Sequence, residues 1–402
     1  MPTFTTIDDL EPAQRLLVRI DVNAPIEDGT AQDNRRFARH AETISELLED
    51  GHALALLAHQ GRPGRDTFVS LESHADVLSA HLDREVAFVS DTFGEEALEA
   101  IRDLEPGDVL LLENSRMCEG ELPEEEPAVK AETELVRTLA PEFDAYVNDA
   151  YSAAHRSHAS LVGFPLVMDA HAGRVMETEY TANSAIRDRE FDGTVTMVLG
   201  GTKAEDLIPV IEQVDDTVDR FCLGGIVGEL FLRADGHDVG YDVDGTEFFD
   251  HQWADHRETI ERVRSEYGDR LLLASDLAAE SDAGERTEAA VENIEKETSY
   301  LDVGSETARR YADLVRESDA VFVKGALGVF EDERFADGTV SVLSAIAETD
   351  CFSVVGGGDT SRAIGMYDLE EKDFSHVSVA GGAYVRALTG DSLVGIDVLE
   401  RR

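Results

Sequence analysis

The chain has 402 residues, with 85 acidic and 35 basic side chains, so its formal net charge is −50. Such a charge repels nucleic acid and anionic membranes, and no run of about 18 apolar residues could span a bilayer. The acidic start "MPTFTTIDDLEPAQ" does not resemble a signal peptide. We therefore expect a cytoplasmic protein that binds neither nucleic acid nor membranes.

The acidic residues are spread over the whole chain, and lysine is rare, at only five positions. In molar salt the Debye length falls to about 3 Å, so self-repulsion is screened and an acidic surface keeps a protein soluble. This composition favours a halophile's protein over a generically acidic cytosolic enzyme. The three cysteines, Cys118, Cys222 and Cys351, lie far apart and are typical of reduced thiols.

In the first part of the chain, apolar strands lead into loops. An amphipathic helix is predicted over 37–51, between the first and second strands. Continuous apolar strands between helices indicate a parallel sheet that is covered on both faces. The predicted strand-and-loop segments are 15–25, 52–64, 108–116 and 143–150.

The same pattern begins again beyond residue 165. A helix over 172–188 separates the two series, and we expect it to join two lobes. The fold class is therefore α/β, with two doubly wound, Rossmann-like parallel-sheet lobes beside a cleft: 1–165, a connecting segment 166–185, and 186–385. The predicted strands of the second lobe are 193–201, 219–225, 270–276, 320–328, 351–360 and 376–382.

Basic side chains collect at the predicted strand ends of the first lobe. The stretch "AAHRSHAS" at 153–160 holds two histidines and an arginine without an acid, and Arg36 stands just before the first helix. One such cation is usually a surface residue, but cations from separate segments at one sheet edge indicate an anion site. Asp21 and Asn23 could accept hydrogen bonds from ligand hydroxyls. The cations are Arg19, His59, Arg62, Arg116, His155, Arg156 and His158.

Glycine-containing turns follow four strands of the second lobe, at 200–203, 324–328, 356–360 and 380–382. Glycine allows the backbone to approach phosphate closely, and a following helix offers free N–H groups. Asp359 in the third turn could hold Mg²⁺ or simply cap a helix. A small-anion lobe and a polyphosphate lobe together indicate phosphoryl transfer across a cleft that closes to exclude water.

The ordered segments "VRIDVNAP", "HQGRPG", "LLENSR", "YVNDAYSAAHRSHASLVGF", "LGGTK", "KGALGVFE", "FADGT", "VVGGGDT" and "SVAGGA" resemble phosphoglycerate kinase in its archaeal form. The resemblance covers nearly the whole chain. It implies reversible phosphoryl transfer between 1,3-bisphosphoglycerate with ADP and 3-phosphoglycerate with ATP, using Mg²⁺. It also implies that the final segment, 386–402, returns to the first lobe, and that the protein is a monomer or weak dimer.

The resemblance also assigns residues to roles. Arg36 matches the arginine that stabilises the phosphoryl group in transit, Lys203 matches a lysine that contacts nucleotide phosphate, and Asp359 matches the metal ligand. The implied substrate-binding residues are Asp21, Val22, Asn23, Arg36, His59, Gln60, Gly61, Arg62, Arg116, His155 and Arg156. The implied nucleotide-binding residues are Lys203, Gly325, Glu331, Gly357, Gly358, Asp359 and Thr360.

The chain departs from the wider family in its second lobe. Leu207 replaces a second lysine of bacterial and eukaryotic members, and Lys324 replaces an asparagine. We predict that Lys324 supplies the missing charge as a catalytic residue; the alternative is a solvated lysine that happens to follow a strand. Two other functions remain open: a bilobed solute-binding protein and a catalytically silent homologue that only binds nucleotide.

Overall fold

The structure, a computed structural model, describes residues 3–240, 248–296 and 298–400. It forms two compact units, one of residues 1–181 with 391–402 and the other of residues 182–390. Helix α7 (Arg174–Asp188) carries the chain from the first unit into the second, and it begins later than the expected connecting segment. No helix among the described residues is long and apolar enough to cross a membrane.

The first unit is built on a six-stranded parallel sheet with the order β5-β6-β4-β1-β7-β8. Strand β1 lies between β4 and β7, and the side chains of β4 are all buried. A strand buried on both sides reads as a continuous apolar run, which is why the sequence predicts it. The strands are β1 (Arg15–Arg19), β4 (Ala53–Leu57), β5 (Ala87–Phe88), β6 (Val109–Leu111), β7 (Ala145–Asn148) and β8 (Ala170–Ala172).

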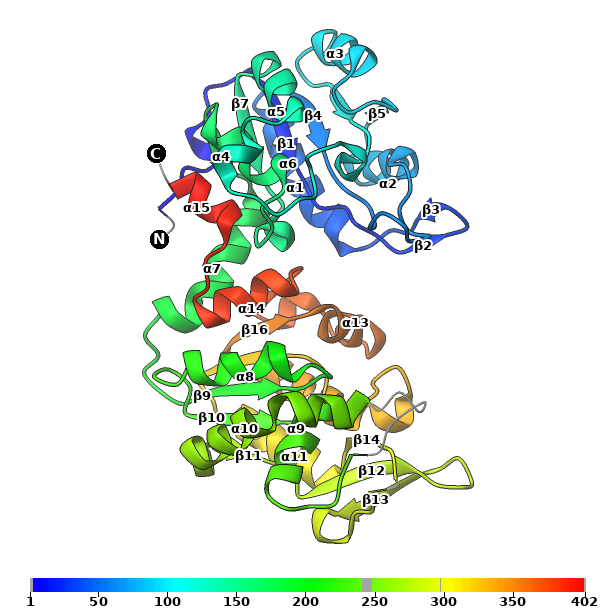
Figure 1. The fold of residues 1–402 in the computed structure, drawn as a ribbon, viewed down its shortest axis with the longest axis vertical. Coiled ribbons are helices and arrows are strands. Elements are labelled where there is room, and N and C mark those ends of the chain that lie inside the picture. Colours follow the sequence, from blue (N-terminus) through cyan, green and yellow to red (C-terminus); the bar gives the residue numbers. More distant parts are fainter. Residues whose placement is uncertain (1–2, 241–247, 297, 401–402) are drawn as a thin grey trace. The chain divides into compact units, whose positions relative to one another are not determined.

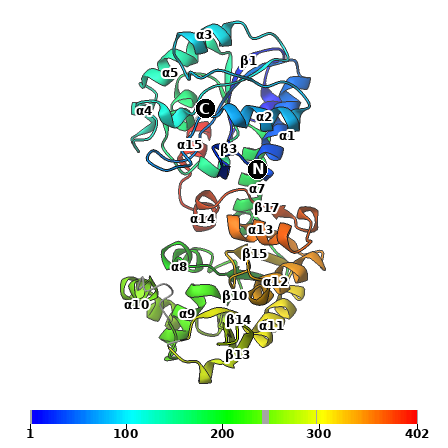
Figure 2. The same ribbon diagram turned by 90° about the vertical axis from the view of Figure 1, so that its right-hand side faces the viewer.

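Helices cover both faces of this sheet (Figure 2). They are α1 (Arg35–Glu49), α2 (Glu72–Leu82), α3 (Glu95–Arg102), α4 (Pro127–Lys130), α5 (Glu134–Leu139) and α6 (Ala159–Val162). The C-terminal helix α15 (Val394–Glu400) packs on α6 and β8, and the Gly395 N–H donates to the Ala154 carbonyl at 2.8 Å (Figure 1). The end of the chain thus completes the core of the unit in which it begins.

The second unit has another six-stranded parallel sheet, in the order β11-β10-β9-β15-β16-β17. This is a doubly wound sheet, in which strands are added toward one edge up to β11 and toward the other edge from β15 onward. Such sheets bind ligands at the switch point between β9 and β15. The strands are β9 (Val195–Leu199), β10 (Arg220–Leu223), β11 (Leu271–Leu272), β15 (Ala320–Lys324), β16 (Phe352–Gly356) and β17 (His376–Val377).

Helices α8, α9 and α10 lie on one side of this second sheet, and α11 and α12 lie on the other (Figure 2). This arrangement confirms the prediction of two α/β lobes with parallel sheets. The helices are α8 (Ala204–Gln213), α9 (Gly225–Ala234), α10 (Phe248–Tyr267), α11 (Ser305–Arg316), α12 (Asp337–Ala347), α13 (Gly358–Met366) and α14 (Gly382–Thr389).

Two small antiparallel elements were not predicted from the sequence. One is the hairpin of β2 (Ile26–Glu27) and β3 (Thr30–Ala31). The other is a three-stranded sheet of β12 (Asp276–Glu280), β13 (Arg286–Ala290) and β14 (Tyr300–Val303). The predicted strand 270–276 is therefore only β11, followed by the start of β12. Strand β13 is mostly exposed and polar, so no apolar run marks it.

We expect the folded protein to lose stability at low salt. Its net charge of −50 repels itself once the Debye length grows to about 10 Å near 0.1 M salt. The measurement is the thermal transition by circular dichroism during stepwise dilution from molar potassium chloride to about 0.1 M. The transition temperature should fall with each dilution, and a constant transition temperature would contradict the screening argument.

Candidate active site

In the first unit, the predicted substrate residues follow four strands that lie side by side. Asp21 comes after β1, His59 after β4, Arg116 after β6, and His155 after β7. Because all these strands are parallel, their carboxyl ends meet at one edge of the sheet. The topology therefore brings together residues that are distant in sequence.

Asp21 is the buried anion of this group. Its Oδ2 lies 3.2 Å from Nη1 of Arg36 and accepts a hydrogen bond from the Ser152 hydroxyl, and its Oδ1 lies 4.0 Å from Nε2 of His59. Burial alone would raise the pKa of Asp21, but the charge of Arg36 and the hydrogen bonds hold it well below its usual range. Asp21 is therefore ionised, and it orients Arg36.

Arg19 contacts the Nδ1 side of the His59 ring and is itself completely buried. Its guanidinium donates to Ser160 Oγ at 2.9 Å and lies 2.9 Å from Nδ1 of His59. A guanidinium only donates, so Nδ1 accepts and the ring proton sits on Nε2, which faces Asp21. Burial lowers the pKa of His59 well below its ordinary value, and the positive charge of Arg19 acts in the same direction, although Asp21 opposes them. Arg19 thus positions a neutral His59.

The loop after β4 is fixed by its neighbours. The Gly61 N–H donates to Asn23 Oδ1 at 2.8 Å, and the Gln60 amide bonds both backbone groups of Ala24. Gly61 has φ of +66°, and a Cβ there would lie 2.3 Å from the Thr67 carbonyl oxygen, so only glycine fits.

Three further residues of the implied substrate set lie in or near this loop. Val22 is fully buried, so it and Gln60 shape the site. Arg116 donates to the Gly61 carbonyl, while Arg62 is exposed.

Acids from another loop face the basic stretch 153–160. Glu124 lies 3.5 Å from Arg156 and 3.8 Å from His158, and the buried Glu121 lies 3.9 Å from His158. Burial, followed by repulsion from Arg116 and Arg19, lowers the pKa of His158 to about 3. His158 is therefore neutral and is not one of the site's cations. The stretch itself contains no acid, so the sequence alone did not show that the fold places Glu121 and Glu124 opposite it.

A buried chain of hydrogen bonds that begins at the Asp21 backbone was not predicted. The Asp21 N–H donates to His40 Nε2 at 3.1 Å, and His40 Nδ1 lies 2.7 Å from Asp149. Asp149 also accepts the Val175 N–H at 2.8 Å, at the start of α7. A single histidine on the inner face of α1 carries no sequence signal for this role, because core histidines look the same.

Acid pH should destabilise the protein through His74. This buried side chain of α2 lies 3.0 Å from Gln60, and burial lowers its pKa to about 4. Below pH 6.5, the ordinary pKa of histidine, the imidazole binds a proton in the unfolded chain but not in the folded protein. The stability that His74 contributes is therefore lost as the pH falls from about 6.5 to 4.

The measurement is urea unfolding at pH 7 and pH 5 in fixed molar salt. The wild type should lose about 2 kcal/mol more than His74→Gln over this interval. His251→Gln, which removes an exposed histidine of helix α10, serves as the control and should behave as the wild type. Equal losses in the wild type and His74→Gln would contradict the role assigned to His74.

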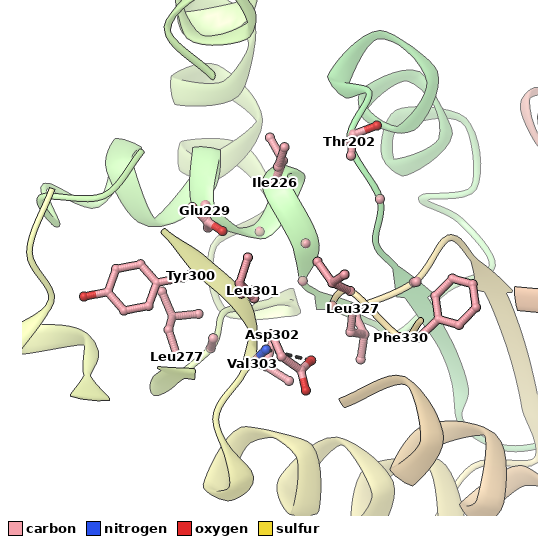
Figure 3. A pocket seen from close by; sticks show the side chains of 18 of the residues that line it. Thr202, Ile226, Glu229, Leu277, Tyr300, Leu301, Asp302, Val303, Leu327 and Phe330 are labelled. Atoms are coloured by element: carbon pink, nitrogen blue, oxygen red, sulfur yellow. Dashed lines mark hydrogen bonds between the residues drawn. The ribbon is translucent and has the colours of Figure 1, made fainter. Parts of the chain in front are cut away.

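In the second unit, a cavity of about 270 Å³ opens at the switch point of the sheet (Figure 3). Segments that follow β9, β10, β15 and β16 contribute to its lining, which is mainly apolar. Its polar members include Thr202, Glu229, Asp302, Glu331 and Asp359. A small apolar cavity with a few placed polar groups is the usual form of a ligand site.

Glycine turns form the edge of this cavity. Gly325 has φ of +83°, and a Cβ there would lie 2.1 Å from the Gly200 carbonyl oxygen, so the turns after β15 and β9 pack closely. Gly357 has φ of +109° and directly precedes α13, whose first N–H groups have no side-chain cap. Thr360 is buried, and its hydroxyl donates to the Gly356 carbonyl at 2.8 Å, which ties this turn to the helix.

Lys324 ends β15 and is half-buried beside the glycine turns. A Cβ on Gly357 would lie 3.4 Å from its Nζ. Burial lowers the pKa of Lys324 against the opposing charges of Asp206 and Asp359, while the repulsion of Lys203 lowers it further. The lysine therefore lies among charged groups of the candidate site and is not a solvated surface residue.

Leu207, where the resemblance implies a lysine in bacterial and eukaryotic members, is buried in the packing of α8, with 3% of its surface exposed. Glu331 lines the cavity and pairs with Arg362 at 3.1 Å. Asp302 is buried, and it pairs with Arg286 at 3.0 Å and accepts the Gly338 N–H at 3.1 Å. The sequence analysis missed Asp302 and Glu229, because each lies within an otherwise apolar segment.

Comparison with known proteins agrees with this description. The family model "Phosphoglycerate kinase" matches residues 7–391. A phosphoglycerate kinase of Halorubrum lacusprofundi is 68% identical over 401 residues, covering 100% of this chain and 98% of the relative. One of Haloarcula marismortui is 65% identical, covering 99% and 100%. Both organisms are halophilic archaea, in agreement with the halophile prediction.

Similarity to solved structures covers the same length. The crystal structure of phosphoglycerate kinase from Pyrococcus horikoshii OT3 aligns with a TM-score of 0.91 and 32% identity over 98% of both chains. A structure from Coxiella burnetii aligns with a TM-score of 0.81 and 30% identity, also over 98% of both chains. The order of motifs, the two sheets and these similarities together show that the chain belongs to the phosphoglycerate kinase family.

Proposed function

We propose that the two units divide one phosphoryl-transfer reaction between them. The first unit binds 3-phosphoglycerate or 1,3-bisphosphoglycerate, the second binds ATP or ADP, and the phosphoryl group passes reversibly between them. The observation that supports this proposal is the gathering of residues at two sheet edges. One edge holds a cationic group around Asp21, and the other holds glycine turns beside an apolar cavity.

The first-unit site suits a small ligand with phosphate, hydroxyl and carboxyl groups. Arg62, Arg116, His155 and Arg156 supply positive charge or donors, and a guanidinium fork matches phosphate or carboxylate. Asp21 is ionised and can accept a hydrogen bond from a ligand hydroxyl, and Asn23 lies next to it. His59 offers an Nε2–H from a fixed, neutral ring.

The second-unit site suits a nucleoside polyphosphate. The apolar cavity takes the base, and Glu331 lies where a ribose hydroxyl can be bound. The N–H groups at Gly357 and Gly358 donate hydrogen bonds to phosphate oxygens, and the dipole of α13 favours the negative charge. Lys203 and Lys324 neutralise phosphate charge.

The residues of the second site fit a Mg²⁺ ion that arrives on nucleotide phosphates. Asp359 offers one exposed carboxylate in the first turn of α13, and one or two carboxylates with phosphates are the usual Mg²⁺ environment. No group of three His, Cys, Asp or Glu side chains able to hold a metal ion occurs within the described part of the chain. When bound, the ion would neutralise charge on the phosphate oxygens, with Asp359 holding it.

Catalysis in this scheme rests on position and charge, so no side chain becomes a covalent intermediate. Arg36, held by Asp21 and the Asn23 carbonyl, stabilises the oxygens of the migrating group. Lys203 and Lys324 act on the nucleotide side. We further propose that the protein works in the cytoplasm as a monomer or weak dimer.

The test is a coupled assay of the protein with 3-phosphoglycerate and Mg-ATP in high potassium chloride. Turnover that depends on both substrates supports the proposal. Nucleotide binding by calorimetry without turnover would identify a silent homologue, and binding of an anion without any nucleotide effect would identify a solute-binding protein.

A further inference from the structure

Helix α1 holds Asp21 of the candidate substrate site at two places. Nη1 of Arg36 lies 3.2 Å from the Asp21 carboxylate, and Nε2 of His40, four residues later on the helix, lies 3.1 Å from the Asp21 backbone nitrogen. Residues four apart lie on the same face of a helix, so both side chains can reach one residue. Arg36 therefore restrains the side chain of Asp21, and His40 restrains its main chain.

The Asp21 N–H lies just beyond the end of β1 and depends on His40 for its acceptor. The preceding N–H, of Ile20, still donates to the Leu57 carbonyl at 3.0 Å. Asp21 and His40 are both buried, so water has little access to the next N–H, and a buried N–H needs an acceptor inside the protein. Removing the imidazole would leave this donor unpaired, which is costly.

Asp149 fixes the His40 ring in the form that Asp21 requires. A backbone N–H only donates, so Nε2 of His40 is the acceptor and the ring proton sits on Nδ1, 2.7 Å from Oδ2 of Asp149. Oδ1 of Asp149 accepts the N–H groups of Val175 at 2.8 Å and Met176 at 3.3 Å, in the first turn of α7. These hydrogen bonds hold the buried carboxylate and, through it, the ring.

We propose that His40 is a positioning residue for 3-phosphoglycerate, acting through the hydrogen bond that it accepts from the Asp21 main chain. In the proposed function, on which this inference rests, the Asp21 carboxylate accepts a hydrogen bond from a ligand hydroxyl. The same carboxylate orients Arg36. A displaced main chain would move both groups relative to the ligand, and small displacements in a site have large effects.

Two substitutions at position 40 separate the two hydrogen bonds of the ring. Asparagine carries its polar atoms near the place of Nδ1, so His40→Asn can donate to Asp149 but leaves the Asp21 N–H unpaired. Glutamine carries them near the place of Nε2, so His40→Gln can accept from Asp21 but leaves Asp149 without this donor. Because the positioning role requires the acceptor for Asp21, His40→Asn should impair substrate binding and His40→Gln should not.

The experiment is calorimetric titration of the full chain with 3-phosphoglycerate and, separately, with ATP, in fixed molar potassium chloride. His40→Asn should bind 3-phosphoglycerate about tenfold more weakly than the wild type, the effect of one buried hydrogen bond, with an unchanged Kd for ATP. His40→Gln should bind both ligands nearly as the wild type does. Equal Kd values for 3-phosphoglycerate in wild type and His40→Asn would overturn the inference, as would an equal weakening in His40→Gln.

The matched control is His52→Gln, at the other end of β1. His52 is also buried, and its Nδ1 accepts the N–H of Gln14, which directly precedes β1, at 3.0 Å. Glutamine has no acceptor near the place of Nδ1, so the variant loses a comparable hydrogen bond away from Asp21 and should keep the wild-type Kd for 3-phosphoglycerate. A weakening as large as that of His40→Asn would reflect general destabilisation and would contradict the inference.

Hydrogen exchange of the Asp21 amide, measured by mass spectrometry, tests the same hydrogen bond even if His40→Asn does not fold. The amide should be protected in the wild type and in His40→Gln. Rapid exchange of this amide in the folded wild type would show that His40 does not hold it, and the inference would fall. A wild type that does not bind 3-phosphoglycerate at all would instead overturn the proposed function, so the two failures are distinguishable.

Discussion

Arg36→Ala should lower kcat by roughly 10³- to 10⁵-fold, the range for an arginine that stabilises a migrating phosphoryl group. The structure supports this expectation, because Arg36 is held by ionised Asp21 at 3.2 Å and by the Asn23 carbonyl at 3.2 Å. A preorganised guanidinium acts mainly in the transition state, so the KM for 3-phosphoglycerate should change much less than kcat.

The measurement is steady-state kinetics at fixed high salt, with Arg137→Ala as the control. Arg137 lies on α5 in an exposed pair with Glu132, so its loss removes the same charge from the same unit without touching the site. The control should keep wild-type kcat. An Arg36→Ala enzyme that retained more than about a tenth of wild-type kcat would not fit a transition-state role.

Lys324→Asn should lower kcat by roughly 10- to 10³-fold, because one aligned charge in a dry site is worth about 2–4 kcal/mol. The lysine lies next to Gly357, and the charges of Asp206 and Asp359 act on it at the candidate phosphate site. The resemblance implies an asparagine at this position in the wider family, so the backbone should tolerate it. The loss should therefore reflect charge and not misfolding.

Two variants sharpen this test. Lys324→Arg keeps the charge and should recover part of the rate, whereas Lys324→Met keeps the bulk and should not. Lys372→Asn removes an exposed lysine that pairs with Glu370 and should leave kcat at the wild-type value. Wild-type turnover of Lys324→Asn would mean that the departure from the family is neutral. Adding Leu207→Lys to Lys324→Asn is not a suitable way to restore the lost positive charge, because position 207 is buried.

The parallel sheets and their ligand-bearing edges could be predicted because both depend on local pattern. Continuous apolar runs such as "ALALL" mark strands that are covered on both faces, and the residues after them must emerge at one edge. The strand β13 could not be predicted, because its exposed polar side chains resemble a loop. The edge strands β5 and β8 are too short to leave a clear signal.

The roles of individual side chains were harder to predict than their location. Arg19 and His158 follow the pattern of strand-end cations, yet Arg19 is a buried support and His158 is neutral beside Glu121. Which cation faces a ligand depends on contacts between distant segments. Glu229 shows the opposite failure, since one acid in an apolar helix gives only a weak signal and its surroundings come from β14.

The return of the chain end to the first unit has a consequence for biosynthesis. Residues 182–390 form one continuous unit that is inserted into the other, whereas α15 packs on α6 only after the whole sequence has been made. Because a ribosome releases the chain from the N-terminus, residues 182–390 emerge before Val394–Glu400. The first unit must wait for Val394–Glu400 to leave the ribosome before its core is closed.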